Sequence, residues 1–280
     1  MSKKTRYFDT SELRLVASEW GSPDDQSVLL LHGAGQTRHT WNRLAKSLAA
    51  KGYYVLSLDF RGHGDSDWSP KGDYSSDAFI GDIKFILKQL HNKPILVGAS
   101  LGGMMSMLLD GESDEELVKA VVLVDITPNI DKGGIERIIG FMQSNLTGFA
   151  NTDEAADSIA AYLPHRPKPK DSSGLMRNLR LRDDGRYYWH WDPAFFGDKN
   201  ATANDAISRN EAAAKNIKVP TLLLRGEHSD LVTEENAKLL LDYIPHAEYV
   251  DISNAHHMIV GDNNDVFSAA VEKFLEGLDG

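Results

Sequence analysis

The chain has 280 residues, a formal net charge of −11 at pH 7 and no cysteine. This length is sufficient for one large hydrophobic core without a second independent domain. The acidic balance argues against nucleic-acid binding, because contact with phosphates needs a basic face, and the lack of cysteine excludes disulfides and thiolate metal sites. The sequence shows neither a secretory signal nor an apolar run near the roughly 18 residues of a membrane span. We therefore expect a cytoplasmic protein that does not enter a membrane.

Most of the chain alternates apolar strand segments with helical ones. Residues 13–20 alternate loosely and end in the turn-forming run 21–25, which predicts an antiparallel hairpin into a strand at 27–31. Helices and strands are then expected in alternation over 41–51, 54–59, 76–90, 95–97, 104–109 and 120–125. This alternation predicts an α/β fold with right-handed crossovers and a mostly parallel, doubly wound sheet.

One segment combines a strand, a tight turn and the start of a helix. The apolar residues 95–97 run directly into Gly98-x-Ser100-x-Gly102. A serine at such a corner has its hydroxyl pushed out of the sheet, and the following helix aims its first N–H groups at the same point. We therefore expect Ser100 to act as a nucleophile.

A nucleophilic serine needs oxyanion donors, a base and an acid that orients the base. The strand at 27–31 ends in the small-residue loop His32-Gly33-Ala34-Gly35. Because such a loop can bring a backbone N–H to a substrate oxygen, we expect the N–H groups of Ala34 and Leu101 to form the oxyanion hole.

Two later strands also end in loops that carry polar side chains. Residues 221–224 lead into a loop with Asp230, and residues 249–252 lead into Asn254-Ala255-His256-His257-Met258. The order Ser, Asp, His, each on a loop after a strand, is the chain order of the α/β-hydrolase triad.

These motifs resemble the α/β-hydrolase superfamily, close to its small bacterial esterases, perhydrolases and C–C hydrolases. The resemblance spans nearly the whole chain and rests on Leu31–Gly33, Asp59–Ser66, Gly98–Gly103, Arg225–Asp230 and the loop of His257. It implies an α/β-hydrolase fold with a serine nucleophile.

The resemblance also ranks the candidates for base and acid. It favours His257, which precedes apolar residues, over His256, which stands where relatives usually carry glycine and is the alternative base. Asp230 follows its strand at the usual family distance and is the preferred acid, with the role of holding His257 in its tautomer. Asp125, at the end of the strand before the break in the pattern, is the alternative acid.

The strand pattern stops between residues 127 and 216, where helical stretches, prolines and aromatic residues follow one another. We interpret 127–216 as a mainly helical cap inserted into a core of 1–126 and 217–280, at the sheet edge where the catalytic loops meet. A surface excursion away from the site is the alternative. Residues 187–191 alternate like an extended segment, so only one parity can face a pocket. The predicted pocket residues are Gly33, Trp189, Trp191 and Met258.

Together these residues predict a serine hydrolase that cleaves a small carboxylic ester or lactone through an acyl-enzyme on Ser100. Hydrolysis of a C–C bond in a β-diketone-like compound and perhydrolysis are the enzymatic alternatives, and a ligand-sensing protein without turnover is the non-enzymatic one. No cofactor or metal is expected, because the adjacent histidines lack a third ligand at metal spacing and residues 98–103 lack the Lys-Ser/Thr of a phosphate loop. The natural substrate and the oligomeric state stay open.

Overall fold

The computed structural model describes residues 2–164, 168, 171–196, 203–257, 259–262 and 264–278. Its main element is an eight-stranded sheet in the order β1-β2-β4-β3-β5-β6-β9-β10. The strands are β1 (Lys4–Asp9), β2 (Arg14–Trp20), β3 (Ser27–Leu31), β4 (Tyr54–Asp59), β5 (Ile95–Ala99), β6 (Ala120–Val124), β9 (Thr221–Gly226) and β10 (Glu248–Ile252).

The strands from β4 to β10 in this order run parallel to one another. At one edge of the sheet, β2 runs antiparallel to both of its neighbours, β1 and β4. Every residue of β3, β5 and β6 is buried. Continuous burial is typical of parallel strands that helices cover on both faces. The prediction of a mostly parallel, doubly wound sheet is confirmed.

The predicted hairpin between β2 and β3 is wrong. The strand β2 pairs with β1 on one side and with β4 on the other, and β3 lies between β4 and β5. A turn does follow β2 and leads into β3. After β3 the chain continues through α1 (Asn42–Ala50) into β4, which lies between β2 and β3 in the sheet. Turn-forming residues predict that the chain reverses direction, but they do not predict which strand will pair with β2.

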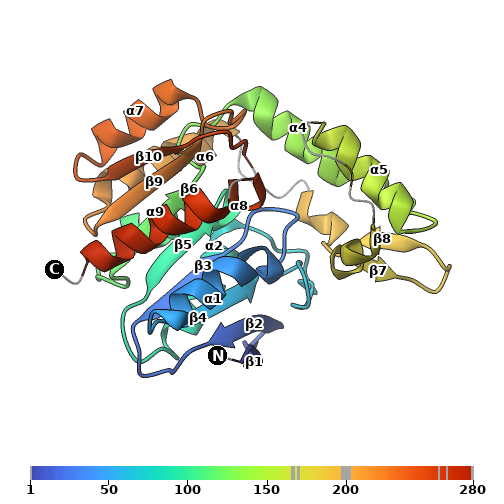
Figure 1. The fold of residues 1–280 in the computed structure, drawn as a ribbon, viewed down its shortest axis with the longest axis horizontal. Coiled ribbons are helices and arrows are strands. Elements are labelled where there is room, and N and C mark those ends of the chain that lie inside the picture. Colours follow the sequence, from blue (N-terminus) through green and yellow to red (C-terminus); the bar gives the residue numbers. More distant parts are fainter. Residues whose placement is uncertain are drawn as a thin grey trace.

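Helices cover both faces of the sheet (Figure 1). On one face, α1 and α9 (Asn264–Gly277) pack on the strand residues that include Val28 and Leu30. On the other face, the alternate residues Leu29 and Leu31 belong to the core formed with α2 (Ser76–Leu87), α3 (Leu101–Gly111), α6 (Ala203–Asn216) and α7 (Glu234–Tyr243). This division follows from the alternation of side chains along each strand.

A smaller group of elements follows β6 and precedes β9, at the carboxyl end of the parallel strands (Figure 1). It contains α4 (Lys132–Gln143), α5 (Thr152–Tyr162) and the antiparallel pair β7 (Leu179–Leu181) and β8 (Tyr187–Trp189). These elements enclose a small core of their own, formed by Met142, Phe149, Ala155, Leu179, Trp189 and Trp191. Helix α6, the last part of the predicted insertion 127–216, packs instead against α3 beside the sheet.

Short helical elements complete the chain: the 3₁₀ turns η1 (Arg38–Trp41), η2 (Ser173–Asn178) and η3 (Pro193–Phe196), and α8 (Ile259–Asp262). Among the residues that the structure describes, no helix is both long enough and apolar enough to cross a lipid bilayer.

Candidate active site

Ser100 occupies the sharp turn between β5 and α3. Its backbone has φ 48° and ψ −112°, a region that residues other than glycine rarely adopt and that tends to occur at functional sites. The turn is held by a hydrogen bond from Ser100 N to Val124 O at 3.0 Å. A Cβ on Gly98 would overlap the backbone of Gly102, so the small residues of the motif are needed for strand and helix to approach this closely.

A buried carboxylate meets His257 at the same edge of the sheet. Nδ1 of His257 lies 2.6 Å from Oδ2 of Asp125, whose side chain is 1% exposed. The carboxylate also accepts hydrogen bonds from Gly226 N at 3.0 Å and from Ser229 Oγ at 2.5 Å. These two donors and the histidine ring hold the oxygens of the buried carboxyl group in a fixed orientation. With Nδ1 bonded to the carboxylate, Nε2 of His257 is the nitrogen that can accept a proton.

Asp230, the preferred acid of the sequence prediction, does not occupy this position. Its side chain is 43% exposed and forms an ion pair of 2.5 Å with Nη2 of Arg137 on α4. The structure thus places the alternative acid, Asp125, beside the histidine. The reason is the sheet order: β6 and β9 are neighbours, so the loops after both strands reach the same edge. The loop after β9 supplies Ser229 to the site and directs Asp230 towards the cap.

Of the two adjacent histidines, His257 is the one that is hydrogen-bonded to Asp125. The ring of His256 lies 5.4 Å from that of His228. The geometry thus brings His257 to the carboxylate, and its role as the base stays a prediction.

The loop after β3 forms a tight turn beside Ser100. Gln36 N donates to Gly33 O at 3.1 Å, and Gly33 N donates to Oε1 of the Gln36 side chain at 3.0 Å. Leu101 is the first residue of α3, where a backbone N–H has no acceptor within its own helix. An oxyanion hole formed by the N–H groups of Ala34 and Leu101 stays a prediction.

Ser100 and His257 line one cavity of about 80 Å³. Its other described lining residues come from the β3 loop and from the cap: Gly33, Ala34, Gly35, Gln36, Ile138, Phe141, Met142 and Tyr162. Residues of α4 and α5 thus line the same cavity as Ser100. Ile138, Phe141 and Met142 have the i, i+3, i+4 spacing of one helix face, a signal in the sequence that we did not use to predict the pocket.

The predicted pocket residues have mixed outcomes. Gly33 lines the cavity, but neither Trp189 nor Trp191 is among its described lining residues. The two indoles are buried in the core of the cap and stack on each other with ring centroids 5.0 Å apart. Both side chains lie on the same face of the extended segment and point into the cap. The prediction that they line the pocket is therefore not supported. Met258 lies outside the described residues.

Comparison with known proteins gives the family of the chain. The alpha/beta hydrolase fold family matches residues 26–264. The chain belongs to the α/β-hydrolase fold family. It is 29% identical over 234 residues to the esterase Rv0045c of Mycobacterium tuberculosis, covering 79% of this chain and 72% of the relative. It is 28% identical over 264 residues to a mouse (Mus musculus) sn-1-specific diacylglycerol lipase, covering 89% of this chain and 80% of the relative.

Solved structures show the same fold. The crystal structure of an E-2-(acetamidomethylene)succinate hydrolase superposes with a TM-score of 0.86 at 23% identity, over 98% of this chain and 100% of the other. The fold of this α/β-hydrolase is thereby established independently of its sequence motifs.

A buried histidine joins the cap of this α/β-hydrolase to two loops of the core. His190 follows β8, accepts a hydrogen bond from Gly64 N on Nδ1 at 2.8 Å, and places Nε2 at 3.2 Å from Gly35 O. The backbone after it is tied as well, because Asp192 N donates to Gly62 O at 2.9 Å. Residues 190–192 of the cap are thus fixed to the core and to the loop that carries Ala34.

Three histidine rings form a buried row behind the site. The ring centroids of His32 and His63 are 5.2 Å apart, and those of His63 and His190 are 5.9 Å apart. Burial lowers the pKa of His32 to about 4 and that of His63 to about 3, and it lowers the pKa of His190 well below the ordinary value. All three rings are therefore neutral at pH 7, and their roles are structural.

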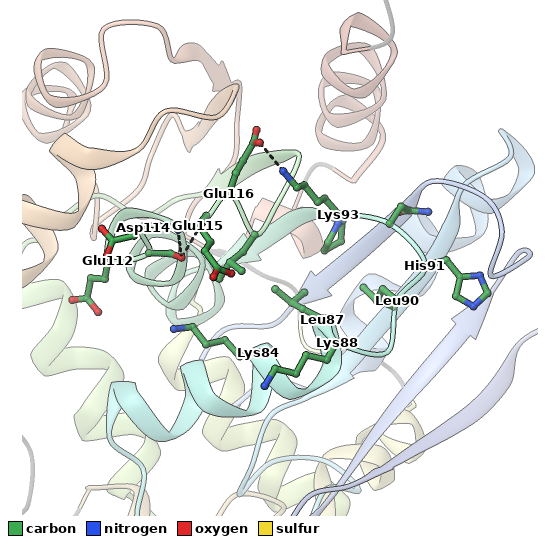
Figure 2. A pocket seen from close by; sticks show the side chains of 14 residues that line it. Lys84, Leu87, Lys88, Leu90, His91, Lys93, Glu112, Asp114, Glu115 and Glu116 are labelled. Atoms are coloured by element: carbon green, nitrogen blue, oxygen red, sulfur yellow. Dashed lines mark hydrogen bonds and ion pairs between the residues drawn. The ribbon is translucent and has the colours of Figure 1, made fainter.

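A larger groove of about 780 Å³ is lined by the residues shown in Figure 2, and Ser100 is not among them. It is lined by the end of α2, the end of α3 and the residues that enter β5 and β6. Ser100 follows the carboxyl end of β5, so this groove is at the opposite edge of the sheet. Its charges have both signs, and Lys93 pairs with Glu116 at 2.6 Å. No nucleophile with a base beside it stands among the described residues that line it.

A metal centre finds no support in the described part of the chain. No group of three or more His, Asp or Glu side chains there is arranged to hold a metal ion.

Proposed function

We propose that this α/β-hydrolase is a serine hydrolase that cleaves a small carboxylic ester or lactone, with Ser100, His257 and Asp125 as its triad. One observation carries the proposal: His257 is bonded through Nδ1 to a buried carboxylate and lines the same cavity as Ser100. The names of two relatives, an esterase and a lipase, support an ester as the substrate class.

In the first half of the reaction, the Ser100 hydroxyl attacks the carbonyl carbon while Nε2 of His257 takes its proton. The negative charge that develops on the carbonyl oxygen is stabilised by the N–H groups of Ala34 and Leu101. The tetrahedral intermediate then collapses, the C–O bond to the leaving group breaks, and His257 returns the proton to the alcohol.

In the second half, a water molecule gives a proton to His257 and attacks the acyl-enzyme. Collapse of this intermediate releases the carboxylic acid and restores the Ser100 hydroxyl. Asp125 stabilises the imidazolium in both halves without taking its proton. Its hydrogen bonds from Gly226 and Ser229 keep the carboxylate in the orientation that this role requires.

The test combines covalent labelling with a substrate panel. A fluorophosphonate probe should modify wild-type protein at Ser100 and should leave Ser100→Ala unmodified. Nitrophenyl esters and lactones should be hydrolysed, and Ser100→Ala should lose on the order of 10⁶ in kcat. An unlabelled Ser100 together with no turnover would favour a binding protein. Labelling with turnover of β-diketones alone would favour the C–C hydrolase alternative, and a marked preference for peroxide over water in deacylation would favour the perhydrolase.

A further inference from the structure

We propose that the catalytic cavity accepts only short, uncharged acyl groups of about two to four carbons, and that Phe141 and Met142 of α4 set this limit. The inference rests on the proposed serine-hydrolase function and specifies its substrate class.

The first argument is the volume of the cavity. A dry cavity of about 150 Å³ is known to hold benzene, which has six carbons. The cavity beside Ser100 measures about 80 Å³, roughly half of that. On this scale it holds about three or four carbon atoms, which is the carbon chain of a propionyl or butyryl group and leaves room for the smaller acetyl group.

The second argument concerns which part of the substrate must fit. When an ester reacts, the alcohol departs after the first half-reaction, whereas the acyl group stays bonded to Ser100 Oγ until water attacks. The cavity includes Ser100 and His257 among its lining residues, so the acyl group occupies it throughout deacylation. The size limit therefore applies to the acyl group more strictly than to the alcohol.

The third argument is that Phe141 and Met142 are held in place by their neighbours. Met142 is 2% exposed, and its Cε lies 3.2 Å from the position that a Cβ on Gly35 would take. Phe141 stacks on Tyr162 of α5 with ring centroids 4.3 Å apart and an interplanar angle of 13°. Behind them, Nε1 of Trp191 donates to Met142 O at 3.3 Å. Because neighbouring groups pack closely against both side chains, a longer acyl chain cannot displace them without breaking the packing of the cap.

The fourth argument is the charge of the lining. Neither lysine nor arginine is among the described residues that line the cavity. Five of those residues have apolar or aromatic side chains: Ala34, Ile138, Phe141, Met142 and Tyr162. A carboxylate on the acyl chain would lose its hydration there without gaining a cation, which is costly in a small apolar site. The acyl group is therefore expected to be uncharged.

The experiment measures kcat/KM for nitrophenyl esters of acetate, butyrate, octanoate and laurate, and for nitrophenyl hemisuccinate. Hemisuccinate has the four-carbon chain of butyrate with a terminal carboxylate. An acyl group that exceeds its pocket loses about tenfold or more in rate. For wild-type protein we therefore expect the octanoate to react at least about tenfold more slowly than the butyrate, and the hemisuccinate to be a poor substrate.

Two variants test the named wall. Phe141→Ala and Met142→Ala each enlarge the cavity and should raise the octanoate-to-butyrate ratio about tenfold, with little gain for acetate. Leu146→Ala is the matched control, because Leu146 follows α4 in the same cap and is 62% exposed; it should leave the ratio unchanged. Thermal midpoints are measured on all three proteins, and Phe141→Leu replaces Phe141→Ala if the latter does not fold.

The outcomes separate this inference from the proposed function. A wild-type preference for octanoate or laurate, or wall variants that behave like Leu146→Ala, would overturn the size limit while the serine hydrolase stands. Hemisuccinate hydrolysed as fast as butyrate would overturn the requirement for an uncharged group. If no ester is cleaved and the fluorophosphonate leaves Ser100 unmodified, the proposed function fails and the substrate class fails with it.

Discussion

Asp125 and His257, 132 positions apart in the chain, are joined by a hydrogen bond of 2.6 Å between Oδ2 and Nδ1. The carboxylate reaches the ring because Asp125 leaves β6 with φ 50°, which turns its side chain into the loop that follows β10. The buried position and the donors from Gly226 and Ser229 then hold it there.

This bond predicts opposite behaviour for the two aspartates. Asp125→Asn should lower kcat by about 10⁴, because an amide favours the wrong tautomer of the histidine. Asp230→Asn should keep most of the activity, because it removes only an exposed ion pair with Arg137, worth about 0–1 kcal/mol. Steady-state kinetics on both variants decide the matter, and the reverse ranking would restore Asp230 as the acid.

Ser229 is expected to position Asp125. Its hydroxyl donates to the carboxylate and accepts hydrogen bonds from Leu231 N at 3.2 Å and Val232 N at 3.0 Å. Ser229→Ala removes a hydrogen bond to a charged group, which is worth about 1.5–3 kcal/mol, and should lower kcat about tenfold with little change in KM. Ser229→Thr keeps the hydroxyl and should recover most of kcat. A loss of stability in Ser229→Ala with unchanged kcat would show that the hydroxyl supports only the loop.

The indole of Trp191 is expected to stabilise the cap without selecting the substrate. It is buried among Trp189, Phe141 and Met142 and is not among the described residues that line the cavity. Trp191→Ala should therefore destabilise the packing by about 3–5 kcal/mol and should lower kcat/KM by a similar factor for every ester. Thermal denaturation and the ester series measure both effects. A change in acyl-length preference equal to that of Phe141→Ala would instead place Trp191 in the pocket.

The buried histidine row predicts that stability falls in acid. The pKa values of His32 and His63, about 4 and about 3, lie below the value of about 6.5 in an unfolded chain, and that of His190 is also well below it. Below about pH 6.5 the unfolded state therefore binds protons that the folded state does not. Between about pH 6 and pH 5 the free energy of unfolding should then fall by about 3 kcal/mol per pH unit from His32 and His63, and His190 should act in the same direction.

A variant isolates the contribution of one ring in this row. Nδ1 of His63 lies 3.1 Å from Arg61 O, and its Nε2 is buried without a hydrogen-bond partner. His63→Asn retains a donor for Arg61 O and removes the titrating ring, so the slope should decrease by about 1.4 kcal/mol per pH unit. His91→Asn serves as control, because the His91 side chain is 60% exposed. Urea denaturation between pH 4 and pH 7 measures the slopes, and equal slopes for wild type and His63→Asn would contradict the prediction.

Features that depend on neighbouring residues could be predicted from the sequence. The run from Ile95 to Gly102 predicted a buried strand, a constrained serine and a helix, and the structure has β5, Ser100 at φ 48° and α3 there. The core strands β3, β4 and β6 likewise lie where apolar runs predicted them. Such patterns succeed because periodicity and turn chemistry act over a few residues.

Features that depend on which elements become neighbours were decided only by the tertiary structure. Asp125 and Asp230 are both aspartates that follow a strand, and their strands, β6 and β9, lie side by side. Only the carboxylate of Asp125 is hydrogen-bonded to His257. Trp189 and Trp191 were predicted to line the pocket, whereas Phe141 and Met142 of α4 line it in the structure. The pairing of β2 with β4 has the same origin. In each case the local sequence allows two arrangements of similar local energy, and the burial of side chains between distant segments selects one of them.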